Sequence, residues 1–337
     1  MSRNWIRKWS LTVGGSAGGL DLSAMHIKFE IHHMTTQSPN TLIARVYNLS
    51  KTTAKIIQNE FTTVQLSAGY EDNIGLIFKG DIKQKITGRE TPTETYIDNI
   101  AADFDAAYTL ATVQTTLAAG STPRDHWNAV LTQMKPFGVT EGYVSPGILD
   151  QPKYPRAVTL YGMAREVLRT LARTANANWS IQSGKLNMVS KTSSIPGNAV
   201  VLNSATGLIG LPTETITGIM VRALINPNFK VDTILQIDQA SIDRAQLTQL
   251  GTSGAQQLGT LGGTGPDGKQ IQGTLGTGDG FYRVLYIDWN GDNRGTSWYA
   301  DMDCVGVIST HGAIPMGVQE QYFGALGSGP ATKPAQQ

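Results

Sequence analysis

The stretch FYRVLYIDWNGDNRGTSWYADMDCVGV, residues 281–307, decides the fold class of this chain. On both sides of its centre, DWNGDNRG (288–295), apolar and aromatic residues alternate with polar ones, which is the pattern of half-buried strands. Asn, Asp and Gly tolerate the positive φ angles of tight turns, so the centre predicts a hairpin turn. The stretch therefore indicates antiparallel β structure.

A calcium loop is the alternative for the centre of this stretch. Asp288, Asn290 and Asp292 have the spacing of the first three ligands of an EF-hand loop. However, the sixth position is Asn293 instead of glycine, and the twelfth is Tyr299 instead of glutamate. No helical pattern precedes the loop, so the hairpin is favoured.

Composition limits the class of protein. The 337 residues can form two or three domains, 40% of them are apolar, and the net charge of +1 argues against a DNA-binding role. Cys304 is the only cysteine, so we expect a buried strand residue; a nucleophile would need a nearby histidine, and His311 is a weak candidate. Neither a signal peptide nor an apolar run of 18 residues is present, which predicts folding in a reducing cytoplasm.

The segment 1–103 has a β pattern. MHIKFEIHH (25–33) alternates strictly, and further short strands follow, with one helix predicted over KTTAKIIQNE (51–60) behind Ser50 as its N-cap. Several short strands with one helix predict a small barrel or sandwich. We expect Trp5 and Trp9 to pack under the first strand.

The segment 104–205 has a mixed pattern. PRDHWNAVLTQM (123–134) and MAREVLRTLARTA (163–175) predict helices, and WSIQSGKLNMVS (179–190) predicts a hairpin that turns at Ser183 and Gly184. The second helix places Arg165, Arg169 and Arg173 on one face, because they are spaced at i, i+4 and i+8. This basic ridge is either a solvated face or an interface with an acidic partner or a neighbouring subunit.

Strands return over 206–310, where TITGIMVRALIN (215–226) and DTILQIDQA (232–240) precede the opening stretch. Between the predicted strands and the opening stretch, residues 251–280 contain eleven glycines and predict a long mobile loop. Gly262, Gly263 and Asp267 in this loop are further interface candidates. Residues 311–337 predict a largely disordered C-terminal extension.

No known catalytic pattern is present. The cluster GGSAGG (14–19) lacks the dinucleotide-binding spacing and predicts a turn. His26, His32 and His33 lack the spacing of a zinc protease and are expected on an exposed strand surface. The sequence predicts no catalytic, cofactor or metal site, which favours an architectural or binding role.

Several stretches together resemble one family. They are ARVYNLS (44–50), LSAGY (66–70), IFKGDI (77–82), TLYGMAREVLRTLA (159–172), WSIQSGKL (179–186), TGLIGLPTETITGIMVRALINP (206–227) and GFYRVLYIDWNGDNRGTSWYADMDCVGV (280–307). In this order and spacing the chain resembles the baseplate hub proteins of tailed bacteriophages. The resemblance covers about residues 1–310, without the glycine-rich loop.

The resemblance implies an α+β, mainly β fold, with tail-tube-like antiparallel barrels at 1–103 and 206–310 and an intervening α/β domain at 104–205. It implies a homotrimer in the virion baseplate, assembled in the host cytoplasm, whose six barrels meet the hexameric tail tube protein on one side and a trimeric spike or tip protein on the other. The tape measure protein and other baseplate proteins are further implied partners. Genomic DNA would pass through a polar or acidic lumen without sequence-specific binding, and no cofactor is implied.

Two alternatives remain open from sequence. One is a cell-wall hydrolase of a phage tail, which would depend on one or two carboxylates. The other is the hub part of a phage-like secretion or bacteriocin device, which has the same physical properties in another genomic setting.

Overall fold

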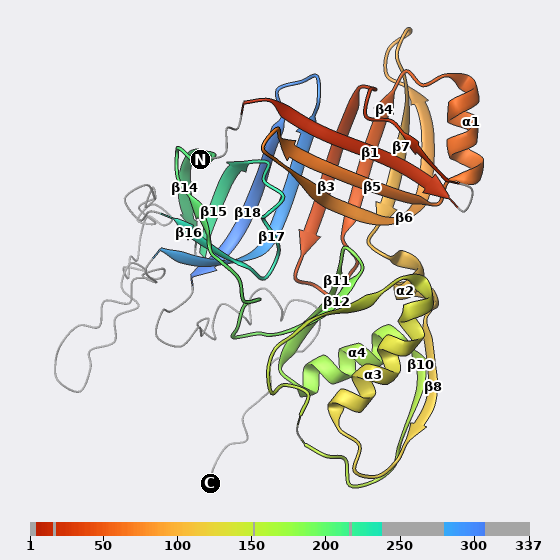
Figure 1. Cartoon of the computed structure of the whole chain (residues 1–337), viewed down its shortest axis with the longest axis vertical. Helices are drawn as coiled ribbons and strands as arrows, with labels where there is room; N and C mark the ends of the chain where they lie inside the picture. Colours follow the sequence, from red (N-terminus) through yellow and green to blue (C-terminus); the bar gives the residue numbers. More distant parts are fainter. Residues whose placement is uncertain (1–4, 16–17, 151, 216–217, 238–279, 307–337) are drawn as a thin grey trace, which may run out of the picture.

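The computed structural model describes residues 5–15, 18–150, 152–215, 218–237 and 280–306. The chain is mainly β, and its strand pairs are antiparallel apart from β9–β12 and β13–β16 (Figure 1). The mainly β, antiparallel class is therefore confirmed. The two separate barrels and the α/β domain stay a prediction.

One large sheet contains strands from both ends of the chain, in the order β14-β15-β18-β17-β3-β4-β7-β6-β5-β1-β2, with β16 joined to β17 and β13 joined to β16. The strands are β1 (Arg7–Gly15), β2 (Gly18–Asp21), β3 (Ile27–Met34), β4 (Thr41–Tyr47), β5 (Thr63–Tyr70), β6 (Asn73–Arg89), β7 (Thr95–Ala102), β13 (Val200–Leu202), β14 (Leu208–Thr215), β15 (Gly218–Leu224), β16 (Ile234–Ile237), β17 (Phe281–Asp292) and β18 (Trp298–Gly306).

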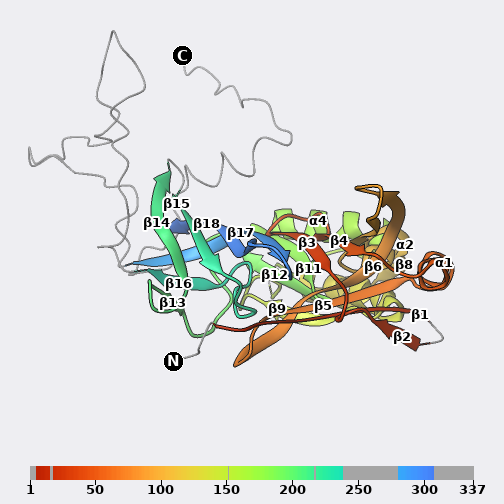
Figure 2. The ribbon, with the colours of Figure 1, turned by 90° about the horizontal axis from the view of Figure 1, so that it is seen from above.

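The long strand β6 folds the sheet onto itself. Its first part, to Asp81, pairs with β5, and its second part, from Asp81 to Arg89, pairs with β7. As a result, β1 and β5 cross over β3 and β4 in a second layer (Figures 1 and 2). Apolar side chains from both layers, and from β15, β17 and β18, form one continuous core. The strands at 7–102 and 200–306 therefore share a core.

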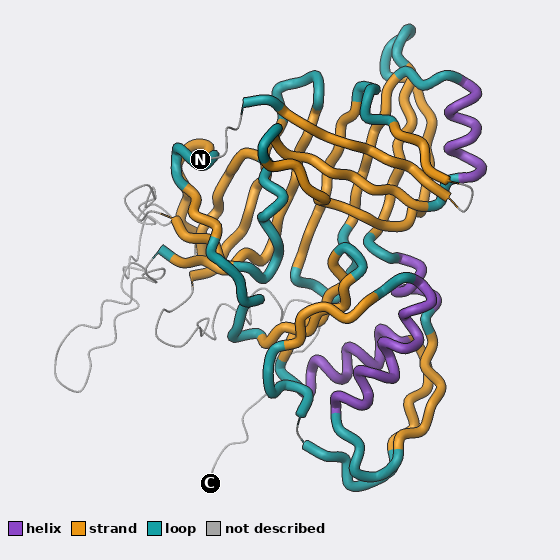
Figure 3. Tube along the Cα trace, in the orientation of Figure 1, coloured by secondary structure: helices purple, strands orange, loops and turns teal. Residues whose placement is uncertain are grey.

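The middle part of the chain has a core of its own, below the large sheet in Figure 1. Figure 3 shows helices gathered there. Trp127, Leu168, Trp179 and Met188 are among its buried residues. Its elements are α2 (Asp105–Leu110), β8 (Thr112–Leu117), α3 (Pro123–Met134), the 3₁₀ turn η1 (Lys135–Phe137), β9 (Thr140–Val144), β10 (Val158–Met163), α4 (Ala164–Thr174), β11 (Ala177–Gln182) and β12 (Lys185–Ser190).

Capping side chains explain where two of the predicted helices begin. At α1 (Lys51–Glu60), Ser50 Oγ accepts a hydrogen bond from Thr53 N at 3.0 Å. At α3, Thr122 and Asp125 form a reciprocal capping box, and a proline occupies the first helical position. These bonds satisfy backbone N–H groups that lack intrahelical partners. Both helices lie where the sequence predicts them.

The predicted hairpin of the opening stretch is present, but its turn comes later. Strand β17 continues through Asn290 to Asp292, and the turn occupies residues 293–297. Asp292 Oδ1 accepts hydrogen bonds from Arg294 N at 2.9 Å and Gly295 N at 2.8 Å, which shapes the turn. Asp288 instead lies beside His32. The two carboxylates therefore serve different contacts rather than facing one cation.

The tryptophan prediction is half right. Trp9 packs against the core and donates a hydrogen bond from Nε1 to Ser23 O at 2.8 Å. Trp5 is 85% exposed, because it precedes Arg7, the first residue of β1 that pairs with β5. Trp298, in contrast, is 2% exposed, with its ring edge-to-face against Trp9 and Phe29.

These environments predict different costs for the same substitution. Trp298→Ala should lower the free energy of unfolding by about 3–5 kcal/mol, because it opens a cavity in the shared core. Trp5→Ala, the matched control, should change it by less than about 0.5 kcal/mol. Urea unfolding followed by circular dichroism measures both. Equal costs would contradict the burial described here.

Candidate functional site

The solvent side of the large sheet carries many charged and polar side chains, which we call the polar face, with Ile43 and Met220 exposed among them. Its charged and polar side chains come from six neighbouring strands. They are Lys28, Glu30 and His32 of β3, Arg45 of β4, Asp98 of β7, Arg222 of β15, Asp288, Asn290 and Asp292 of β17, and Tyr299, Asp301 and Asp303 of β18.

Strand register places these residues on one side. Arg222 lies opposite Asp301, Asp301 opposite Asp288, and Asp288 opposite His32. Residues directly opposite each other in antiparallel strands point to the same side of the sheet. The row therefore crosses from the C-terminal strands to the N-terminal strands without a break.

Bidentate ion pairs organise the two flanks of the polar face. Arg222 donates to Asp301 at 2.6 and 2.9 Å, and its guanidinium lies 4.3 Å from the centre of the Tyr299 ring. On the other flank, Arg45 donates to Asp98 at 2.7 and 2.9 Å. Because a guanidinium and a carboxylate match in shape, these pairs hold their strands in register.

Two histidine–aspartate contacts cross the seam between β3 and β17. His26 Nε2 lies 2.9 Å from Asp292 Oδ1, and His32 Nδ1 contacts Asp288 Oδ1. Lys28 Nζ lies 3.9 Å from Asp292 Oδ2. His26, which precedes β3, and Lys28 and His32 of β3 thus face carboxylates of β17 along this seam.

Carboxylates outnumber cations on the polar face. Asp288, Asp301 and Asp303 occupy adjacent strands, and the pKa of Asp303 is raised by burial and by the charges of Asp288 and Asp301. A concentration of negative charge on one sheet face repels polyanions. In the sequence, the alternating charged positions within 281–303 indicate this face. The sequence alone does not show that β17 pairs with β3.

His33 corrects the prediction that the three histidines lie on an exposed surface. It is on the core side of β3, where Trp289 Nε1 donates a hydrogen bond to its Nδ1 at 3.2 Å. Burial, with a smaller contribution from His32, lowers the pKa of His33 to about 4. The imidazole therefore acts as a neutral acceptor.

The basic ridge is partly used within the chain. Arg165 donates to Tyr108 O at 3.2 Å, and Arg169 donates from Nε to Gln37 Oε1 at 3.0 Å. Arg173 is exposed, and no ion pair involves it among the described residues. Arg165 and Arg169 thus connect α4 to α2 and to the β3–β4 connection, whereas the role of Arg173 as an interface residue stays a prediction. Gly262, Gly263 and Asp267 lie outside the described residues.

Other candidate features have no site geometry. Cys304 is buried, which raises the pKa of its thiol and disfavours the nucleophilic thiolate. Within the described ranges, no three His, Cys, Asp or Glu side chains gather into a possible metal site, and no described helix is long and apolar enough to cross a membrane.

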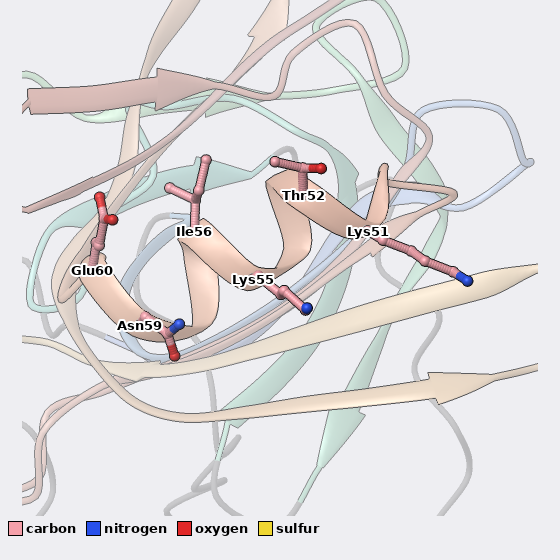
Figure 4. A pocket seen from close by; sticks show the side chains of 6 residues that line it. All are labelled: Lys51, Thr52, Lys55, Ile56, Asn59 and Glu60. Carbon is pink, nitrogen blue, oxygen red and sulfur yellow. The ribbon is translucent and has the colours of Figure 1, made fainter.

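Figure 4 shows a surface hollow along α1. One helix supplies every side chain that lines it, so no opposing wall can enclose a ligand. The lining residues are Lys51, Thr52, Lys55, Ile56, Asn59 and Glu60.

The environment of His33 predicts a pH effect. Its folded-state pKa is below the ordinary value of 6.5. Between these two pKa values His33 is protonated in the unfolded chain and neutral in the folded chain. Stability is then lost as pH falls from about 6.5 towards 4. Between pH 7 and pH 4.5, the wild type should lose about 2 kcal/mol more unfolding free energy than His33→Gln. Parallel losses in urea titrations at both pH values would rule this out.

No protein-family model matches the sequence, and no curated protein matches it. Solved structures do match. The 43 kDa tail protein of prophage MuSo2 from Shewanella oneidensis aligns with a TM-score of 0.53 and 9% identity, over 89% of this chain and 98% of that chain. The tail protein from Neisseria meningitidis MC58 aligns with a TM-score of 0.52 and 8% identity, over 90% of this chain and 97% of that chain. As the sequence resemblance predicts, the chain has the fold of phage tail proteins.

Proposed function

We propose that this protein is a structural baseplate hub of a bacteriophage tail, without catalytic activity. Three copies would form a symmetry adaptor that joins the hexameric tail tube to the trimeric spike or tip. The observation that carries the proposal is the fold shared, over nearly its whole length, with two phage tail proteins. Tape measure and other baseplate proteins would be further partners, and Arg173 is the ridge residue available to them.

The polar face supports a role in lining the DNA channel. A lumen that passes a duplex must not bind its phosphates, and an excess of carboxylates meets that requirement. The flanking arginines, Arg222 and Arg45, are both engaged by aspartates. Their charge is therefore neutralised locally, which would weaken binding of DNA phosphates in the proposed lumen.

Free strand edges support assembly from several copies. Among the described residues, β14 pairs only with β15, and the β6 part from Lys83 to Arg89 pairs only with β7. These two edges end the layer that carries the polar face. Open edges invite pairing with another chain, and head-to-tail contacts form a ring when the rotation between successive copies closes. The first barrel-like part of one copy would meet the second of the next.

Apolar side chains stand exposed near the β14 edge. Leu211 is 63% exposed and Met220, on the neighbouring strand β15, is 52% exposed. Contact with a second copy along β14 would remove Leu211 from water, whereas Met220 lies opposite Asp303 on the polar-face side of β15. The β14 edge is therefore the part of the proposed interface that a substitution can test without disturbing the core.

A charge at this edge should block assembly. We expect wild-type protein to have the mass of three chains by light scattering, and Leu211→Asp to have the mass of one chain with little change in melting temperature. Tyr161→Asp is the matched control, because Tyr161 is 78% exposed on β10, which belongs to the separate two-stranded sheet formed with β8. It should remain trimeric.

Three results would oppose the hub proposal: a wild-type monomer that never joins a tail tube, a ring of six chains, or a trimer unaffected by Leu211→Asp. A cell-wall hydrolase predicts instead that purified protein degrades peptidoglycan and that replacing one or two carboxylates abolishes the activity. A secretion or bacteriocin hub would behave as a trimer as well, and the neighbouring genes distinguish it.

A further inference from the structure

A buried carboxyl group lies where the middle part of the chain meets the large sheet. Asp103 directly follows β7 and is 1% exposed. Its Oδ2 accepts a hydrogen bond from Ser183 N at 2.7 Å, and its Oδ1 lies 3.4 Å from Gly184 N. Both donors belong to the turn between β11 and β12. Asp103 therefore connects the sheet to the tip of a hairpin of the middle part.

Asn40 completes the junction from the sheet side. Its backbone oxygen accepts from Asp103 N at 2.9 Å, and its Oδ1 accepts from Met34 N at 3.0 Å. Its Nδ2 lies 3.4 Å from both Asp103 Oδ2 and Ile181 O. One buried amide thus ties the β3–β4 connection to β7 and to β11.

The tip of the β11–β12 hairpin is packed closely against Phe104. Phe104 has a left-handed backbone conformation with φ 48°, and its ring lies beside the tip. A Cβ atom added at Gly184 would come within 2.6 Å of this ring, and one added at Gly138 within 3.2 Å. The tip is therefore packed closely against the Phe104 ring, with no room for a side chain at Gly184.

The charged groups around Asp103 do not offset its charge. Asp81 on β6 is the neighbouring charge that acts on it, and it is negative. Lys83 on β6 is engaged by Asp105 of α2 at 3.0 Å, and Lys185, which begins β12, is exposed. No ion pair involves Asp103 among the described residues. A carboxyl buried in this way is stabilised by taking up a proton.

We propose that Asp103 is a proton-controlled clasp that holds the β11–β12 hairpin, and with it the middle part of the chain, against the large sheet. The clasp is closed when the carboxyl is neutral and loosens when it ionises. Oδ1, with only the long Gly184 contact, is the oxygen that can carry the proton. This inference does not depend on the proposed hub function, because all of the groups lie within one chain.

The direction of the effect follows from linkage. Burial, opposed by the three hydrogen-bond donors and assisted by Asp81, raises the pKa of Asp103 to about 7. In an open clasp the carboxyl would be hydrated and have its ordinary value near 3.8. The closed form is therefore most favoured at low pH, and its advantage is lost as pH rises towards 7 and is constant above it.

Hydrogen exchange of the full-length protein tests the clasp. After correction for intrinsic rates, the protection of the 181–185 amides should fall about tenfold or more between pH 5 and pH 8. Asp103→Asn should remove this dependence. Asp81→Asn should shift the change to lower pH, because a negative neighbour is lost. Asp150→Asn, an exposed carboxyl in the middle part, is the matched control and should behave as wild type.

Either of two results would overturn the proposal. One is a wild-type protection factor that does not change with pH, and the other is an unchanged dependence in Asp103→Asn. If Asp103→Asn does not fold, Asp81→Asn decides the question, because an unshifted profile in this variant excludes Asp103 as the titrating group.

Discussion

The pairing of β17 with β3 is the contact on which the rest of the structure depends. It brings together residues that are 256 positions apart, such as His32 and Asp288. Closing so long a loop has an entropic cost, which the core beneath the pair must offset. Trp289 and Trp298 lie in that core with Phe29. Without this pairing, the polar face would be divided into two unrelated surfaces.

A buried ion pair fixes β17 from its other end. Arg283 and Asp232 each have side chains only 2% exposed, and Arg283 Nη1 also donates to Lys191 O at 3.1 Å. Loss of either partner would leave a buried charge without compensation, which costs about 3–5 kcal/mol in comparable cases. Since Lys191 directly follows β12, this one arginine holds β17, the loop before β16 and the chain leaving the middle part. β17 is thus constrained along its whole length.

The polar face and the junction between the middle part and the large sheet are held by different contacts. The polar face is formed by paired strands and crossed by the ion pairs Arg222–Asp301 and Arg45–Asp98. The middle part is attached through few polar groups, of which Asp103 and Asn40 are buried. Asp103 was invisible to sequence reasoning, because an aspartate after a strand is usually a solvated turn residue. Asp103 is covered by the β11–β12 turn, which lies eighty residues later in the sequence.

The sequence by itself determined the local elements. Alternation specified β3, β17 and β18, Ser50 specified the start of α1, and Ser183 and Gly184 specified a turn, because each depends on neighbours within a few residues. Tertiary structure decided which strands pair, that Trp5 is exposed and His33 faces the core, and that Arg165 and Arg169 are engaged within the chain. Those outcomes depend on groups far apart in sequence, and alternation assigns a residue to a side of a strand without stating what covers that side.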